Sequence, residues 1–293
     1  MHKAGFVNIV GNPNVGKSTL MNQLVGERIS IATFKAQTTR HRIMGIVNTD
    51  DMQIVFSDTP GVLKPNYRMQ EMMLAFSESA LADADILLYV TDVVENPEKN
   101  LDFLEKVRKM TIPVLLLINK IDESDQQTLG NLVERWHELL PNAEILPLSA
   151  KNKFGVDMLM KRIRELLPES PAYFGKDQLT DKPARFFVSE IIREKILRYY
   201  DKEIPYSVEV VVEQFKETPQ HIHINAVIYV ERDSQKGIII GHRGMALKKV
   251  STEARKSLES FFGKTVFLET FVKVDKDWRN NQRELDNFGY HPE

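Results

Sequence analysis

The feature that most constrains this 293-residue chain is a complete phosphate-binding loop near its N-terminus. The residues from Gly11 to Ser18 follow the spacing Gly-x4-Gly-Lys-Ser. A predicted strand (5–10) leads into the loop and a predicted helix (17–25) leads out, which is the context this motif requires. Backbone N–H groups of such a loop point at an anion, and the helix presents its positive end to the same charge. We therefore expect a nucleotide-binding α/β domain; a chance Gly-rich turn is the alternative.

Strands and helices alternate through the first half of the chain. The expected strands are 5–10, 41–48, 52–57, 86–91, 113–118 and 144–148. The expected helices are 17–25, 70–82, 97–110, 124–140 and 155–167. This alternation predicts a doubly wound, mostly parallel sheet with helices on both faces.

The second half has a different order of elements. Three prolines and a glycine within 168–183, without periodicity, indicate a linker over 169–183. After it we expect a helix at 184–202, strands at 206–215 and 221–231, two helices around a Gly-rich turn within 235–262, a strand at 265–274 and a polar helix at 277–286. The order α-β-β-α-α-β predicts a separate α+β domain. The expected boundaries are thus 1–168, 169–183 and 184–293.

Composition excludes several classes of protein. There is no cysteine, so disulfides, thiolate metal sites and a cysteine nucleophile are excluded. The N-terminus enters a predicted strand directly, so we expect no signal peptide. The longest apolar runs, such as 114–118, are too short to span a membrane and are typical of buried parallel strands. A cytoplasmic protein is expected, and a net charge of −2 decides nothing about nucleic acid.

A guanine-reading motif follows one of the buried strands. Asp122 of Asn119-Lys-Ile-Asp122 is placed to accept hydrogen bonds from the N1–H and the 2-amino group of guanine. Adenine has no such donor pair and would leave the carboxylate unpaired, so the motif predicts GTP rather than ATP. We expect Asn119 to brace the loop and Lys120 to lay its stem along the base. In Ser149-Ala150-Lys151, the Ala150 N–H is expected to meet guanine O6.

Polar residues in three further places complete a predicted GTPase site. Asp58, at the end of the strand 52–57, is expected to hold Mg²⁺ through water, together with the Ser18 hydroxyl. Lys17 is expected to reach the terminal phosphates. Thr39 would complete the Mg²⁺ shell, and the Gly61 N–H would meet the γ-phosphate, only when GTP is bound. An acidic turn and a polar connection between strands are the alternatives for these last two motifs.

Four residues are expected to take part in catalysis: Asn14, Lys17, Thr39 and Gly61. The expected GTP/GDP-binding residues are Gly11, Asn12, Pro13, Asn14, Val15, Gly16, Lys17, Ser18, Thr19, Asp58, Thr59, Pro60, Gly61, Asn119, Lys120, Asp122, Ser149, Ala150 and Lys151. Because Thr39 and Gly61 depend on the γ-phosphate, a first switch segment (30–40) and a second switch segment (60–72) are expected to order with GTP and loosen with GDP.

A second glycine-rich turn lies in the C-terminal half. Between two predicted helices, Gly241-His242-Arg243-Gly244 would bring backbone N–H groups against a nucleic-acid backbone. Seven Lys or Arg and only two acids lie between residues 232 and 256. The expected RNA-binding residues are Lys236, Gly241, His242, Arg243, Gly244, Lys248 and Lys249. A solvated basic helix face is the alternative, and the apolar residues 238–240 are expected to be core.

These motifs together resemble the TrmE–Era group of P-loop GTPases. The resemblance rests on Gly-Asn-Pro-Asn-Val-Gly-Lys-Ser-Thr, Lys-Ala-Gln-Thr-Thr-Arg-His-Arg, Asp-Thr-Pro-Gly and Asn-Lys-Ile-Asp. The segment 230–241 and the tail 287–290 narrow it to the Era family, over nearly the whole chain. Position 12 is Asn where that family usually has Arg, and the turn at 241–244 departs from the usual Gly-Lys-Gly-Gly type.

The resemblance implies an α/β P-loop GTPase domain followed by a KH domain. It implies a GTP-hydrolysing switch that binds the 3′ region of 16S rRNA and assists maturation of the small ribosomal subunit. A monomer in the cytoplasm, with some peripheral association with the membrane, is expected with it. Two alternatives stay open. One is a constitutive rRNA-binding assembly protein with a structural, non-switching nucleotide site. The other is the double GTPase Der, against which the single phosphate loop argues.

The resemblance also bears on catalysis. Val62 follows Gly61 where many GTPases carry the glutamine that orients water, so slow intrinsic turnover is expected. Asn14 resembles the asparagine that holds a monovalent cation in this group, and a K⁺ there would spread the developing negative charge. Asn14 serving only to shape the loop is the alternative.

Overall fold

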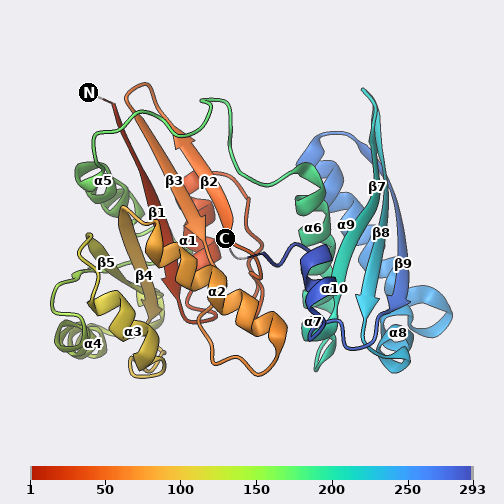
Figure 1. The fold of residues 1–293 in the computed structure, drawn as a ribbon, viewed down its shortest axis with the longest axis horizontal. Helices are drawn as coiled ribbons and strands as arrows, with labels where there is room; N and C mark the ends of the chain where they lie inside the picture. Colours follow the sequence, from red (N-terminus) through yellow and green to blue (C-terminus); the bar gives the residue numbers. More distant parts are fainter. Residues whose placement is uncertain (1, 292–293) are drawn as a thin grey trace. The chain divides into compact units, whose positions relative to one another are not determined.

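The computed structural model describes residues 2–291. The chain divides into two compact units, and each is described by itself. The first holds residues up to Asn66 together with Gln70–Asp181, and the second holds Tyr67–Met69 and Lys182–His291 (Figure 1).

The first unit is a six-stranded sheet with the order β2-β3-β1-β4-β5-β6, in which only β2 runs antiparallel to its neighbour. Its strands are β1 (Lys3–Gly11), β2 (Ile43–Asn48), β3 (Met52–Asp58), β4 (Ile86–Asp92), β5 (Val114–Asn119) and β6 (Glu144–Pro147). Its helices are α1 (Lys17–Val25), α2 (Arg68–Ala82), α3 (Leu101–Arg108), α4 (Gln126–Leu139) and α5 (Val156–Leu166), with a 3₁₀ turn at Ile121–Glu123.

Burial on both faces explains the apolar strands of this sheet. Every residue of β3 and β4 is buried, as expected when helices cover both sides of a parallel sheet. Residues of α2, α3 and α4 share one core with β1, β4 and β5, and Trp136 is its largest member. The helix α1 packs against β1, β3 and α5. The predicted doubly wound, mostly parallel sheet is confirmed. Its topology brings the carboxyl ends of β1, β3, β4 and β5 to one edge, where ligands of such sheets bind.

The proline-rich segment after α5 is irregular but attached to the first unit. The side-chain oxygen of Gln53 accepts hydrogen bonds from the backbone N–H groups of Tyr173 and Phe174, at 2.7 and 3.0 Å. Leu179 O accepts from the N–H of Ile46 at 2.8 Å, so the segment runs along the edge strand β2. An exposed strand edge is a template for aggregation. This segment covers part of that edge.

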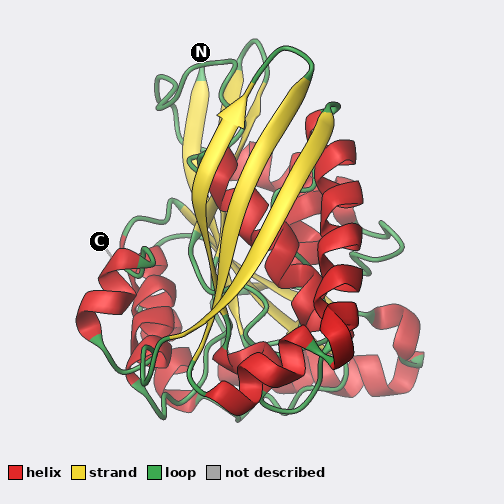
Figure 2. Cartoon of the chain, turned by 90° about the vertical axis from the view of Figure 1, so that its right-hand side faces the viewer, coloured by secondary structure: helices red, strands yellow, loops and turns green. Residues whose placement is uncertain are grey.

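The second unit is a three-stranded sheet with the order β7-β8-β9, antiparallel in the first pair and parallel in the second. The elements are α6 (Ala184–Tyr199), α7 (Ile204–Ser207), β7 (Glu209–Glu217), β8 (His221–Val230), α8 (Asp233–Ile240), α9 (Met245–Phe262), β9 (Thr265–Val274) and α10 (Gln282–Asn287). Helices α6, α8 and α9 pack against one face of this sheet, which Figure 2 shows. A single apolar core joins α6 and α9 to all three strands.

Several predicted elements begin or end at other residues than expected. The helix expected at 97–110 begins only at Leu101, because Asn96 first accepts the N–H of Glu98 in a turn. Between α6 and β7, the pair Ile204-Pro205 starts the one-turn helix α7, since proline suits the first turn of a helix. The last helix is shorter than the expected 277–286 and covers Gln282–Asn287.

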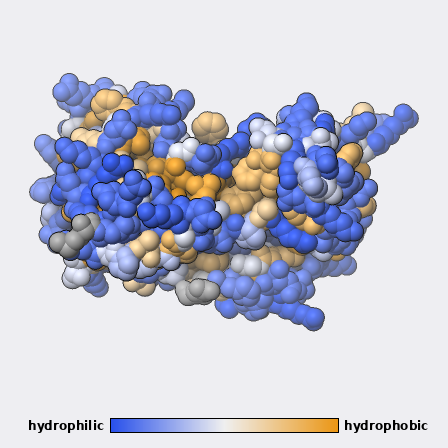
Figure 3. Space-filling model, turned by 90° about the horizontal axis from the view of Figure 1, so that it is seen from above, coloured by the Kyte–Doolittle hydropathy of each residue, from blue (hydrophilic) through white to orange (hydrophobic). Residues whose placement is uncertain are grey.

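None of the helices in residues 2–291 is long and apolar enough to cross a bilayer. Hydrophilic side chains cover most of the face drawn in Figure 3, where apolar residues form separate patches.

Candidate nucleotide site and Gly-x-x-Gly loop

The phosphate-binding loop joins β1 to α1, and its glycines are required by close packing. A Cβ on Gly11 would lie 2.1 Å from Val90 O, and one on Gly16 would lie 2.2 Å from Asn119 Nδ2. Gly16 also has a φ of 96°, which side chains of L-residues rarely adopt. Asn14 is left-handed as well, with a φ of 67°, and asparagine tolerates that conformation better than most residues. The loop shape is therefore set by β4 and β5 as much as by its own sequence.

Lys17 lies across this loop. Its ammonium group donates to Gly11 O at 3.0 Å and to Asn12 O at 2.8 Å. Burial lowers the pKa of Lys17 to about 8, while the nearby carboxylates of Asp58 and Glu95 act in the opposite direction. A lysine ammonium group held at the phosphate-binding loop is the arrangement that receives the terminal phosphates of a nucleotide.

Three oxygen-bearing side chains from different segments meet beside the loop. Ser18 Oγ donates to Asp58 Oδ2 at 2.7 Å and lies 2.8 Å from Thr39 Oγ1. Thr39 Oγ1 is 3.3 Å from the same carboxylate oxygen. Burial raises the pKa of Asp58, although the Lys17 charge opposes this. Within residues 2–291, the second oxygen, Oδ1, is buried with no hydrogen-bond partner of normal geometry, although the Ser30 hydroxyl also acts on this carboxyl group. A buried carboxylate and two hydroxyls are hard oxygen donors, which suit Mg²⁺.

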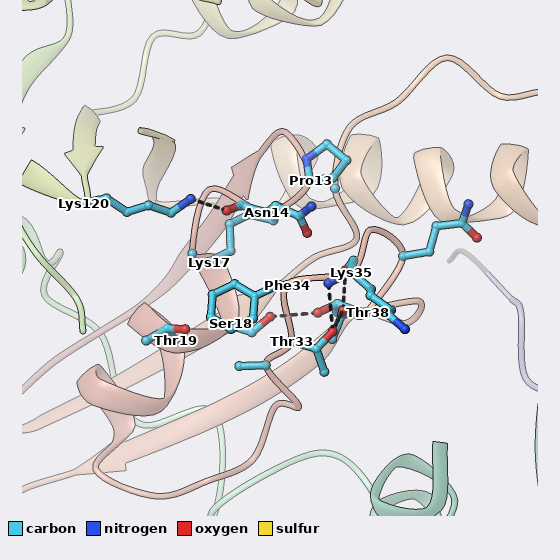
Figure 4. A pocket seen from close by; sticks show the side chains of 15 residues that line it. Pro13, Asn14, Lys17, Ser18, Thr19, Thr33, Phe34, Lys35, Thr38 and Lys120 are labelled. Atoms are coloured by element: carbon cyan, nitrogen blue, oxygen red, sulfur yellow. Dashed lines mark hydrogen bonds between the residues drawn. The ribbon is translucent and has the colours of Figure 1, made fainter. Parts of the chain in front are cut away.

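The adjacent residues Thr38 and Thr39 have different roles, because the conformation of their loop turns the two hydroxyls in different directions. The hydroxyl of Thr38 donates to Lys35 O at 2.6 Å and lies 2.6 Å from Thr33 Oγ1, so it stabilises the loop (Figure 4). Only Thr39 turns toward Ser18 and Asp58. The ring of Phe34, also in this loop, is completely exposed.

The segment after β3 lies against the phosphate-binding loop. A Cβ on Gly61 would come within 2.7 Å of Pro13 atoms, so only glycine fits this approach. Before it, the Thr59 hydroxyl donates to Ile9 O at 2.7 Å, and Pro60 O accepts from Ser77 Oγ at 2.8 Å. The resulting pocket is lined by Pro13, Asn14, Gly16, Lys17, Ser18, Thr19, Ala32, Thr33, Phe34, Lys35, Gln37, Thr38, Thr39, Gly61 and Lys120.

The residues predicted to read guanine lie at the ends of β5 and β6. Asn119 Nδ2 donates to Val15 O at 2.8 Å, and Asn119 Oδ1 accepts from the Ala150 N–H at 2.9 Å. One side chain thus ties the phosphate-binding loop to the segment after β6, as its predicted bracing role requires. Asp122 is exposed at this end of the sheet, and hydrogen bonding to Ser149 together with the Lys151 charge lowers its pKa. An ionised, exposed carboxylate at this place has the acceptor oxygens that the two donors of a guanine edge require.

Lys120 reveals a partner that the motif did not predict. Its ammonium group donates to Asn14 O at 2.7 Å (Figure 4). It also donates to Asp92 Oδ2 at 2.5 Å. Asp92 is the last residue of β4, and its other oxygen accepts the N–H groups of Val94 and Glu95. The sequence did contain a signal for Asp92: it is an acidic residue at the end of a buried parallel strand, and the ends of such strands converge on the ligand site.

The Gly-x-x-Gly loop joins α8 to α9 in the second unit. Gly241 and Gly244 have φ values of 69° and 75°, and Arg243 between them is also left-handed at 51°. A Cβ on Gly241 would lie 2.6 Å from Ala246 Cβ, whereas one on Gly244 would meet nothing within 4 Å. His242 and Arg243 are exposed. The loop therefore presents backbone and two basic side chains to solvent.

The predicted basic residues flank this loop. Lys236 lies on α8, and the exposed Lys248 and Lys249 lie on the first turns of α9. The ammonium group of Lys249 is 4.5 Å from the centre of the Tyr199 ring, a cation–π distance that holds it in place. The apolar run at 238–240 is only partly core, since Ile239 is buried but Ile238 is 48% exposed.

Comparison with known proteins decides the family. The family model described as 50S ribosome-binding GTPase matches residues 6–120, and the KH domain model matches residues 203–279. GTPase Era of Clostridium kluyveri is 43% identical over 292 residues, which cover 99% of this chain and 100% of the relative. The chain belongs to the Era family of GTPases. A match along the full length also removes the double GTPase Der from consideration.

Solved structures of Era agree with this assignment. Aquifex aeolicus Era bound to GDP·AlF4⁻ superposes with a TM-score of 0.94 at 37% identity, covering 98% of this chain and 99% of that one. An Era complex with MgGDPNP and nucleotides 1506–1542 of 16S ribosomal RNA gives the same TM-score and identity, with 99% of each chain covered. The predicted fold class is confirmed, and an Era-family protein is a GTPase that uses GTP, GDP and Mg²⁺.

Proposed function

We propose that this Era-family chain is a switch in which GTP controls binding to the 3′ region of 16S rRNA during assembly of the small ribosomal subunit. The observation that carries the proposal is the meeting of Thr39 with Ser18 and Asp58. A hydroxyl from the first switch segment lies directly at the metal-binding cluster, so loss of the γ-phosphate and its Mg²⁺ contacts would release that segment. The Era relative bound to nucleotides 1506–1542 of 16S rRNA supports the choice of RNA.

The proposed roles follow the geometry of each site. Ser18, Thr39 and Asp58 hold Mg²⁺, which when bound neutralises phosphate charge. Lys17 and the loop amides of residues 11–19 take the phosphates, and the Gly61 N–H takes the γ-phosphate. The base lies among the residues of 119–122 and 149–151. In the second unit, the loop 241–244 clamps the RNA backbone, and Lys236, Lys248 and Lys249 add phosphate contacts.

A constitutive RNA-binding protein with a non-switching nucleotide site is the competing function. The two are separated by measuring the affinity for a 16S rRNA 3′ fragment with a non-hydrolysable GTP analogue, with GDP and without nucleotide. The switch predicts different affinities, together with slower amide exchange in 30–40 and 60–72 in the GTP-analogue state. Equal RNA affinities and equal exchange in all states would leave the constitutive function.

We also propose that Asn14 holds a K⁺ beside the phosphates. Its backbone carbonyl is fixed by Lys120, and its side chain is exposed at the nucleotide pocket. A cation there would stabilise the charge that develops between the β- and γ-phosphates, in place of an arginine. Turnover should be faster in KCl than in NaCl, and Asn14→Ala should remove the difference. Equal rates in both salts for the parent protein would exclude this role.

We propose that residues 1–168 bind GTP, that residues 184–293 bind RNA, and that residues 169–183 connect the two domains. The structural attachment of the segment up to Asp181 to the first unit supports placing the functional joint at Lys182 and Pro183. A monomer in the cytoplasm that associates peripherally with the membrane stays a prediction of the family resemblance.

A further inference from the structure

One asparagine links three parts of the nucleotide site. Asn100 Nδ2 donates to Asn12 Oδ1 in the phosphate-binding loop and to Val62 O, at 3.1 Å, in the second switch segment. The acceptors are 88 and 38 residues away along the chain. Asn12 is only 3% exposed, so the contact lies inside the protein, where a lost partner is costly. Both hydrogens of one amide group are thus committed to the site.

Asn100 makes these contacts instead of a hydrogen bond that would cap its own helix, α3. It occupies the N-cap position of α3, where asparagine is among the most stabilising residues because its side chain accepts a free N–H of the first turn. Here the side chain caps nothing, with φ and ψ of −136° and 62°. A cap contributes about 1 kcal/mol to a helix. The side chain has turned away from this stabilisation toward residues 12 and 62.

The contacts fix the residue that follows Gly61. The Val62 N–H donates to Gly11 O at 3.0 Å, and its carbonyl accepts from Asn100. Its side chain is 3% exposed and packs in the core formed with Phe103 and Leu104 of α3. Val62 is therefore held by its N–H, its carbonyl and its side chain. Through it, Gly61 is held against Pro13, at the place where its N–H would meet the γ-phosphate.

We propose that Asn100 is a positioning residue for GTP hydrolysis. It ties the phosphate-binding loop to the start of the second switch segment, so that Gly61 reaches the γ-phosphate in one defined geometry. Asn100 does not line the nucleotide pocket, so its loss acts on the rate of hydrolysis rather than on nucleotide binding. A misplacement of about 1 Å at a reacting centre lowers the rate roughly 100-fold, which sets the upper size of the effect.

Serine at position 100 separates positioning from stability. Asn100→Ser restores a good N-cap, which offsets part of the cost of removing the donor from Asn12 Oδ1 and Val62 O, so the thermal midpoint of unfolding should fall by no more than about 5 °C. The short hydroxyl does not span both acceptors, so the single-turnover rate at saturating GTP should fall about 10-fold or more, within the limit set by misplacement. The affinity for fluorescent GDP should change less than about twofold, because the phosphate and guanine contacts are untouched.

Two further variants complete the test. Asn100→Asp keeps the shape but replaces the donor by an acceptor facing Asn12 Oδ1 and Val62 O, so it should be slower still. Asn96→Ala is the matched control: Asn96 is an exposed asparagine of the same segment, and its side chain accepts the N–H of Glu98. It should turn over GTP at the parent rate. A parent-like rate in Asn100→Ser, or an equal loss in Asn96→Ala, would overturn the proposal. A GDP affinity that falls in step with the rate would also overturn it.

Discussion

Each of the two glycine-rich loops of this protein precedes a helix and has a predicted role in binding phosphates, but different interactions determine their conformations. In the loop at 11–18, a Cβ on either of two glycines would lie 2.1 or 2.2 Å from atoms of neighbouring strands, and the lysine is 6% exposed. In the loop at 241–244, a Cβ on the second glycine would meet nothing within 4 Å, and both central side chains are exposed. The first loop is shaped by the whole domain around one ligand. The second is shaped by its own backbone and stays open.

The difference reflects what each loop binds. A nucleotide has a fixed shape and is recognised from several strand ends at once, so the binding loop must be fixed by tertiary contacts. An RNA strand passes over a surface and supplies similar phosphates at every step, so a locally stable backbone with basic neighbours is enough. Substitutions at the nucleotide site should therefore lower ligand affinity more than substitutions in the RNA-binding loop.

The largest effect is expected from the base-reading carboxylate. In Asp122→Asn the acceptor pair becomes an acceptor and a donor, so guanine loses a charged hydrogen bond and gains a clash of donors. GTP affinity should fall by about 1,000-fold, corresponding to roughly 4 kcal/mol, while affinity for xanthosine triphosphate should rise. Competition between the two nucleotides measures the change. A variant that still prefers GTP would remove Asp122 from the base site.

The next largest effect tests the fixed loop. Gly16→Ala adds a Cβ 2.2 Å from the Asn119 amide at a φ of 96°. The strain and the displaced Asn119 should weaken GDP binding by about 100-fold, or roughly 2.7 kcal/mol. RNA affinity without nucleotide should be unchanged because the loop at 241–244 belongs to the other unit. Loss of both activities would indicate unfolding, which circular dichroism would detect.

A smaller effect is expected from the open loop. Replacing both His242 and Arg243 by Asp places negative charge where a phosphate chain approaches. Affinity for the 16S rRNA 3′ fragment should fall by about 30-fold in moderate salt, and the salt dependence should become shallower by about one phosphate contact. Fluorescent GDP should bind as in the parent protein. Unchanged RNA binding would mean that another surface holds the RNA.

The smallest effect separates the two glycines of that loop. Gly244→Ala meets open space and carries only the left-handed penalty, so the free energy of unfolding should fall by about 1 kcal/mol. Gly241→Ala also collides with Ala246 at 2.6 Å and should lose about twice as much. Urea unfolding followed by Trp278 fluorescence, in a Trp136→Phe background, reports on this unit. Equal losses would contradict the crowding argument.

Much of this architecture was predictable because short-range patterns determine it. The apolar runs of β3 and β5 predict buried parallel strands, and the motifs at their ends place Asp58 and Asn119 at one edge of the sheet. What the sequence did not predict depends on distant partners. Nothing local shows that Asn100 turns from its helix to Asn12, or that Gln53 fastens the segment near Tyr173. Lys120 was expected beside the base, but its ionic partner Asp92 comes from another strand.

The hydrogen bonds that attach the proline-rich segment (169–183) to Gln53 and β2 reduce its flexibility. Fifteen residues of coil would be a tether, leaving the RNA-binding unit free to explore a large volume. With the segment held as far as Asp181, only Lys182 and Pro183 separate it from α6 at Ala184. Proline fixes its own φ, so few torsions remain free. The connection between the segment and α6 is therefore a short, stiff hinge of two residues rather than a flexible tether.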